Sequence, residues 1–243
     1  MKRIIDIILS SIGLFFLSPI ILICLFLIWV YDFNNPFYAQ LRMGKNYKPF
    51  KMYKLRSMYK GADNSGVLST SSNDNRITPI GKIIRKIKLD EISQLINVFI
   101  GNMSLVGPRP QVISHINNEY TNVEKELLIV KPGITDFSSI VFSDEAEILK
   151  NSLNPDLDYN QLIRPWKSRL GILYIRHQSI LLDIKLILLT IISIISKEKA
   201  LNGINKILLK FSVDKKLIEV AKRKNQLTPY PPPGSKSIVS LKD

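Results

Sequence analysis

The sequence predicts an α-rich α+β membrane protein, and three observations support this fold class. Hydrophobic residues make up 46% of the 243 residues, yet the net charge is +14. Residues 7–31 contain no charged side chain, and this uncharged run is long enough for a helix within a membrane. Short strand-like runs and longer segments of helical periodicity follow. They predict a small cytoplasmic domain with a short β-hairpin and interfacial amphipathic helices.

The N-terminal segment, residues 1–33, is predicted to stay in the membrane as a helix. Ser18-Pro19 lies near its middle, and an interior proline removes a backbone hydrogen bond, so a break is expected there. Lys2 and Arg3 precede the apolar run, and six Lys or Arg residues lie in residues 42–56 after it. The positive-inside rule then favours both ends on the cytoplasmic side. A re-entrant hairpin and a kinked transmembrane helix remain equal alternatives on these grounds.

Residues 37–42 and 50–55 read as two strands, with turn-forming residues 43–46 between them. Lys54 and Arg56 are two positions apart, so a strand would place both on one face. Two cations on one face would suit a diphosphate. A solvated edge strand is the equal alternative.

The rest of the chain is organised around residues 77–110, which contain two apolar stripes at helical spacing. The stripes are offset by roughly 100°, which predicts a break near Leu89-Asp90. Thr78 is expected to cap the first helix, with Pro79 in its first turn, and Asp90 to cap the second. Four cations near Asp90 should keep it ionised, as a nucleophile or metal ligand needs: Lys82, Arg85, Lys86 and Lys88.

Three motifs in order then resemble a known family. The run LDEISQLINVFIGNMSLVGPRP (residues 89–110) is accompanied by Lys-Leu-Arg-Ser-Met at 54–58 and Lys-Pro-Gly-Ile-Thr at 131–135. Together they resemble the bacterial sugar transferases, the monotopic phosphoglycosyl transferases. The resemblance covers roughly residues 1–196. It implies a catalytic domain over 34–196 and an N-terminal re-entrant membrane helix broken at Ser18-Pro19.

The resemblance also implies an activity: transfer of a sugar-1-phosphate from a UDP-sugar to polyprenyl (undecaprenyl) phosphate, releasing UMP. This would occur at the cytoplasmic face of the bacterial inner membrane, in surface glycoconjugate assembly. Asp90 would be the nucleophile beside Glu91, and both would hold Mg²⁺, with assistance to proton movement as the alternative role of Glu91. Lys54, Arg56, Arg85 and Arg109 would bind phosphate, with Pro108 and Pro110 fixing Arg109. The sugar itself is not specified by these motifs.

The match departs from the family at three places. Ser93 stands where many relatives have Pro, and Asn102 where many have Asp. Residues 136–145 replace the usual Gly and Gln-Val-x-Gly elements, so donor-recognition residues cannot be carried over to this loop. His115 and His177 lack a partner at ligand spacing and are expected to be structural.

The later segments carry weaker signals. Residues 112–130 are expected to form one polar helix, and the uncharged run 186–196 to lie in the interface or on the core. Asp183 is either a structural anchor or a site residue. The extension, residues 197–243, is expected to be a basic amphipathic surface helix followed by a disordered Pro-rich tail. A solvated basic appendage is the alternative for the helical part.

The charge predicts anionic membrane lipid as a partner. Nucleic acid is not expected as a partner, since no recognisable nucleic-acid motif accompanies the charge. A catalytically inactive membrane scaffold is the rival function, although the intact Asp90, Glu91 and Arg109 argue against it. The oligomeric state stays open, a homodimer included.

Overall fold

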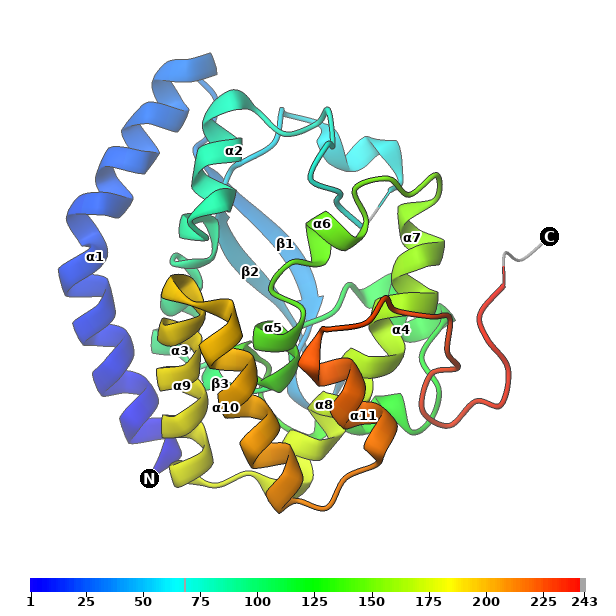
Figure 1. Ribbon diagram of the computed structural model, residues 1–243. Helices are drawn as coiled ribbons and strands as arrows, with labels where there is room; N and C mark the ends of the chain where they lie inside the picture. The colour runs from blue at the N-terminus through cyan, green and yellow to red at the C-terminus, as the bar shows by residue number, and fades with distance from the viewer. Residues whose placement is uncertain (68, 241–243) are drawn as a thin grey trace.

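A single long helix, α1 (Lys2–Asp32), lies along one side of the molecule as a bowed rod (Figure 1). The computed structural model describes residues 1–67 and 69–240. The break expected at Ser18-Pro19 is absent, because α1 continues through both residues. Ser18 Oγ donates to the Phe15 carbonyl at 2.8 Å, which is the carbonyl that Pro19 leaves without its usual N–H donor. The Ser-Pro pair therefore keeps this carbonyl bonded inside an intact helix.

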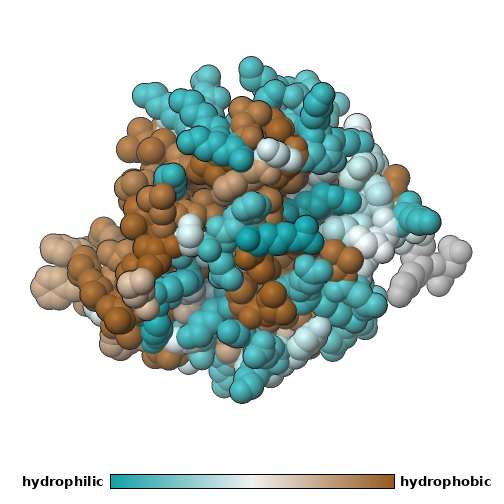
Figure 2. Space-filling model, turned by 90° about the horizontal axis from the view of Figure 1, so that it is seen from below, coloured by the Kyte–Doolittle hydropathy of each residue, from teal (hydrophilic) through white to brown (hydrophobic). Residues whose placement is uncertain are grey.

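One face of α1 packs on the domain, and the other is apolar and exposed. Ile21, Cys24 and Ile28 pack with Leu55 and Ile84. The outward face exposes large side chains, among them Phe15, Phe16, Leu22, Ile23 and Phe26. Figure 2 shows hydrophobic surface gathered at the end of the molecule where α1 lies. In the described part of the chain, α1 is the one helix long and apolar enough to cross a membrane.

The predicted hairpin is confirmed as an antiparallel pair, β1 (Phe37–Met43) and β2 (Pro49–Leu55). A short 3₁₀ turn, η1 (Lys45–Tyr47), lies between them. A second, unexpected sheet pairs β3 (Ser104–Val106) with β4 (Gly133–Thr135) in parallel. Two stretches far apart in the sequence, which both belong to the family motifs, thus lie side by side.

The central stretch folds as two helices with a sharp break, as predicted. Thr78 Oγ1 accepts from Gly81 N–H at 2.9 Å and caps α2 (Pro79–Lys86). Lys88 then adopts a left-handed conformation with φ 56°, ahead of the 3₁₀ turn η3 (Leu89–Glu91) and α3 (Gln94–Ile100). Asp90 lies inside that turn. The prediction that it caps the second helix is wrong, because Ser93 occupies the position before α3.

The single helix expected over 112–130 is also wrong, because the chain turns between α4 (Ile113–Asn118) and the 3₁₀ helix η4 (Glu124–Ile129). Thr121 and Glu124 cause this turn, because the side chain of each accepts a hydrogen bond from the backbone N–H of the other.

The remaining elements before the C-terminal helices are mostly short. They are η2 (Ala62–Ser65), α5 (Phe137–Val141), α6 (Glu145–Ile148), α7 (Pro155–Asp158), the π-helical η5 (Tyr159–Ile163) and the longer α8 (Arg164–His177).

The main core lies among α5, α8 and the C-terminal helices α9 (Ile180–Ile195), α10 (Lys197–Lys210) and α11 (Lys215–Lys222). The α9 helix also exposes an apolar face, including Leu188 and Ile195. Fully buried Ile204 and Leu208 place α10 in the core. The expectations of a lipid-surface helix and of a solvated appendage are therefore both wrong for α10.

The Pro-rich tail is ordered against the domain over residues 227–240, so the prediction of disorder is wrong there. Tyr230 stacks on Trp166 with 4.4 Å between the ring centroids, and its N–H donates to the Gln161 carbonyl at 3.0 Å. Thr121 Oγ1 donates to the Pro233 carbonyl at 2.5 Å. Residues 241–243 of that prediction lie outside the described residues.

Candidate active site

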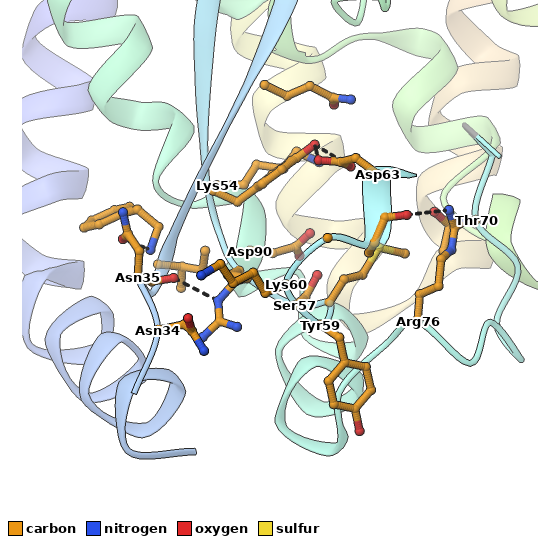
Figure 3. Close-up of a pocket in the computed structure, with 18 of the residues that line it drawn as sticks. Asn34, Asn35, Lys54, Ser57, Tyr59, Lys60, Asp63, Thr70, Arg76 and Asp90 are labelled. Carbon is orange, nitrogen blue, oxygen red and sulfur yellow. Dashed lines mark hydrogen bonds between the residues drawn. The ribbon is translucent and has the colours of Figure 1, made fainter. Parts of the chain in front are cut away.

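Asp90 lies where two cavities meet. The first, about 400 Å³, is bounded by the hairpin, residues 57–63, Val67, Thr70 and Arg76, and the chain just after α1 (Figure 3). The second, about 300 Å³, is bounded by the 88–91 turn, residues 109–112, residues 139–146 and α8. Five residues line both cavities: Arg42, Lys54, Thr70, Arg85 and Asp90. A group at Asp90 can therefore contact ligands from two directions.

The Asp90 carboxylate is buried but has no hydrogen-bond donor. The residue is 8% exposed, and none of the described residues donates to its side chain. Burial raises the pKa of Asp90, while the nearby charge of Lys54 acts to lower it. Because Asp90 lines both cavities, its carboxylate oxygens open toward them rather than being enclosed in the core. Its free oxygens are thus available to a ligand.

Glu91 has the opposite environment. Its Oε1 accepts from Arg109 Nη2 and lies 3.5 Å from Lys54 Nζ. Burial alone would raise the pKa of Glu91, but the charges of Arg109 and Lys54 outweigh it and hold this pKa far below its usual range. Glu91 therefore stays ionised, orients the two cations, and is unsuited to carrying a proton at neutral pH.

Arg109 is positioned near Glu91 by backbone contacts between two of the motifs, the segment that contains Gly107 and the segment that contains Gly133. Gly107 N–H donates to the Thr135 carbonyl at 2.9 Å, and Gly133 N–H donates to the Pro108 carbonyl at 2.9 Å. A side chain on Gly133 would collide with the Gly107 backbone, and one on Gly107 with the Lys131 carbonyl, so both positions require glycine. Pro110 lines the second cavity beside Arg109.

The other predicted cations separate into two groups. Lys54 and Arg85 line both cavities, and Arg85 Nε donates to Ser57 Oγ at 2.7 Å. Arg56 lines only the first, and its guanidinium pairs with Asp32 at 2.5 Å. The two side chains expected to bind one diphosphate thus have different partners, and Arg56 ties the end of α1 to the hairpin.

Sequence reasoning missed several lining residues. Arg42 is half-buried; partial burial, and then the Arg109 charge, lower its pKa. Lys167 comes from α8 and pairs with Glu145 across the second cavity. His115 lines the same cavity, whereas His177 stacks on Phe211 at 4.0 Å. No local pattern marks Lys167, because only the packing of α8 brings it here.

Residues 1–197 match the model of the bacterial sugar transferase family. The chain belongs to that family. It is 36% identical over 194 residues to a UDP-glucose:undecaprenyl-phosphate glucose-1-phosphate transferase of Klebsiella pneumoniae. The matched region covers 78% of this chain and 39% of that protein. It is 34% identical over 209 residues to the exopolysaccharide production protein PSS of Rhizobium leguminosarum bv. phaseoli, covering 82% and 97%. The chain thus spans only about two fifths of the length of the first curated relatives it matches.

One departure from the sugar transferase pattern has a structural explanation. Ser93, which stands where many family members have Pro, is fully buried. Its hydroxyl lies 3.1 Å from the Tyr53 carbonyl and 3.3 Å from that of Asp90, so it can donate to either. It joins the Asp90 turn to β2 and therefore supports the site.

The residues around Asp90 fit Mg²⁺ only as a site with few protein ligands. No cluster of three or more His, Cys, Asp or Glu residues occurs among the described residues. Mg²⁺ commonly uses one or two carboxylates, several waters and substrate phosphates. The donor-free carboxylate of Asp90 and the second oxygen of Glu91 match that requirement.

Proposed function

We propose that this protein transfers a sugar-1-phosphate from a UDP-sugar to undecaprenyl phosphate, giving undecaprenyl-diphosphate-sugar and UMP. The observation that carries the proposal is the buried, donor-free Asp90 carboxylate at the junction of two cation-lined cavities. The family membership and the printed activities of the relatives support it. A catalytically inactive scaffold is not favoured, since it has no use for a donor-free carboxylate among cations.

The two cavities suit two substrates. The first is bordered by Asn34 and Asn35, the residues that leave α1, so it would admit the phosphate of a lipid held in the membrane. The second adds Lys88, Arg109 and Lys167 to the shared cations and would take the donor diphosphate. The sugar then lies toward residues 142–146. Asp90 is accessible from both sides.

The chemistry has two displacements. An Asp90 oxygen attacks the sugar-bearing phosphorus, the bond from that phosphorus to the bridging oxygen breaks, and UMP leaves. An oxygen of the lipid phosphate then attacks the same phosphorus, and Asp90 departs as a carboxylate. Arg109 and Lys54, oriented by Glu91, would stabilise the charge on the transferring group. Mg²⁺ held by Asp90 and Glu91 would offset diphosphate charge.

The donor half-reaction tests this proposal. Enzyme, Mg²⁺ and a panel of UDP-sugars, without lipid, should release up to one UMP per active site and leave a phosphosugar on Asp90, detected by mass spectrometry. Direct attack by the lipid phosphate in a ternary complex predicts no UMP before lipid is added, and no adduct. That second pattern with a verified donor would refute the covalent route.

We further propose that the unbroken α1 does not cross the membrane but lies in one leaflet, with both ends at the cytoplasmic face of the bacterial inner membrane, in place of the re-entrant hairpin expected from the sequence. Both ends contact the same domain: Lys2 Nζ lies 2.5 Å from Asp183, and Asp32 pairs with Arg56 at 2.5 Å. Asp6 also accepts from Ser104 Oγ. A helix anchored this way lies beside its domain, with its exposed apolar face in one leaflet. The net charge of +14 favours anionic lipid there.

Cysteine accessibility tests the topology. One cysteine would be inserted after Met1 and another would replace Asn34, each in a Cys24→Ser background. Both should react with an impermeant thiol reagent only when the cytoplasmic face is exposed. Labelling of the N-terminal cysteine from the outside would show that α1 crosses the membrane.

A further inference from the structure

The C-terminal extension, residues 197–240 of the described chain, lies almost entirely beyond the segment that matches the family. We propose that the extension positions residues 142–146 at the second cavity and so determines which UDP-sugar is accepted. This inference rests on the proposed function. Asp144, Lys197 and Arg223 are its positioning residues.

The contact between the two segments is ionic and aromatic. Asp144 Oδ2 lies 2.5 Å from Lys197 Nζ and 3.4 Å from Arg223 Nη2. The Arg223 guanidinium also lies 5.5 Å from the Phe142 ring centroid, in cation–π geometry. Burial opposes ionisation of Asp144, but hydrogen bonding to Lys197 and the Arg223 charge outweigh it and lower its pKa. The contact is therefore charged at neutral pH.

The segment held by this contact forms part of the site. Phe142, Ser143, Glu145 and Ala146 line the second cavity together with Asp90 and Glu91. Its other tethers are the Lys167–Glu145 pair and a hydrogen bond from Ser72 N–H to the Ala146 carbonyl at 2.9 Å. Residues 142–146 thus have contacts with α8, with residue 72 and with the extension.

The extension is rigid enough to set a position. Its helices bury Ala200, Ile204, Leu208 and Ala221 completely in the main core. Arg223 follows directly after α11, in a left-handed conformation with φ 54° that directs the chain away from the helix. Core packing of this kind transmits small displacements. A shift of the cavity lining by about 1 Å can cost a hundredfold in rate.

The sequence is consistent with a role in selectivity. Residues 136–145 are where this chain departs from the family's donor-loop pattern. The segment that contacts them, through Arg223, is the one outside the family match. The contact therefore joins a segment that departs from the family's pattern to one outside the family match, whereas Asp90, Glu91 and Arg109 belong to the shared motif.

The test uses full-length protein carrying Arg223→Gln or Asp144→Asn, with UMP release measured across the UDP-sugar panel. Each variant should raise KM for the preferred donor. It should also lower the ratio of kcat/KM for the best donor to kcat/KM for the second-best donor by about fivefold or more, since pocket contacts give roughly 10–200-fold discrimination between similar substrates. Arg223→Lys should keep most of the selectivity. Lys222→Gln is the matched control and should behave as wild type, because among the described residues Lys222 pairs only with exposed Glu219 on the same helix.

A role in stability alone gives a different result. Unchanged donor ratios and KM in both Arg223→Gln and Asp144→Asn, with at most a lower melting temperature, would overturn the inference. Asp144→Asn keeps the experiment decisive if Arg223→Gln folds poorly, since the Asp144 side chain is 32% exposed. Wild-type protein that releases UMP from no donor would instead refute the proposed function, and the inference with it.

Discussion

Two of the buried acidic groups among the described residues, Glu124 and Asp90, have opposite surroundings. Glu124 is fully buried, and its carboxylate accepts from Arg164 at 2.9 and 2.7 Å, from Ser168 Oγ at 2.7 Å and from Thr121 N–H at 3.0 Å. Asp90 is almost as deeply buried but accepts no hydrogen bond from any described residue. It also faces two cavities, whose lining does not include Glu124.

This difference in hydrogen bonding distinguishes an acidic residue that serves stability from one that serves function. A buried carboxylate with all of its acceptor sites used contributes to folding, and removing its charge leaves its partner buried and unpaired. A mostly buried carboxylate that has no donor among the described residues and opens into two cavities is available to a ligand. The two residues should therefore respond in opposite ways to the same change of acid to amide.

The largest expected effect is that of Asp90→Asn on turnover. The amide is a poor nucleophile, so UMP release should fall by about 10³-fold or more, and no phosphosugar adduct should form. Because burial raises the pKa of Asp90, ionisation at neutral pH opposes folding, and the neutral amide should leave the melting temperature unchanged or higher. Retained turnover, or a marked loss of stability, would break the comparison.

Glu124→Gln should show the reverse. Breaking the buried pair with Arg164 should lower the free energy of unfolding by about 3 kcal/mol in denaturant titrations. UMP release per folded molecule should stay close to wild type. Glu126→Gln is the control on the same turn, since its pair with Arg176 is exposed, and should change stability by less than about 0.5 kcal/mol. Equal stability of the two variants would contradict a structural role for Glu124.

Arg109→Lys should have the next largest effect. The charge is kept but the planar fork is lost, so turnover should fall well over tenfold, because bidentate phosphate contact depends on geometry. The protein should still fold, since Lys can remain paired with Glu91. Activity near that of wild type would show that Arg109 serves only to pair with Glu91.

The smallest effect is a change in pH dependence. Asp90 must be ionised to attack, so kcat/KM for the donor should fall on the acidic side of its raised pKa. Lys54→Met removes the cation that most lowers this pKa, so the acidic limb should move to higher pH. Lys82→Met loses an exposed charge of the same sign and should leave the limb in place. An unmoved limb in Lys54→Met would mean that Asp90 does not set it.

Local patterns predicted the parts of this protein that depend on neighbouring residues. The uncharged run of α1, the hairpin at 37–55 and the break before Asp90 follow from periodicity, turn residues and the Thr78 cap. Each of these features depends on residues that lie close together in the chain, so the sequence alone contains its physical cause. Asp90, Glu91 and Arg109 were predicted as site residues because they lie in a contiguous motif.

Tertiary packing decided the rest. The partners of Glu91 and Asp32 are distant residues, and nothing local to Arg56 distinguishes its ion pair with Asp32 from a phosphate site. The basic pattern of α10 resembled a lipid-surface helix until Ile204 and Leu208 proved to be buried in the core. Charge and amphipathicity define a face of a helix but not what covers it. That depends on contacts between segments far apart in the chain, which no short stretch of sequence specifies.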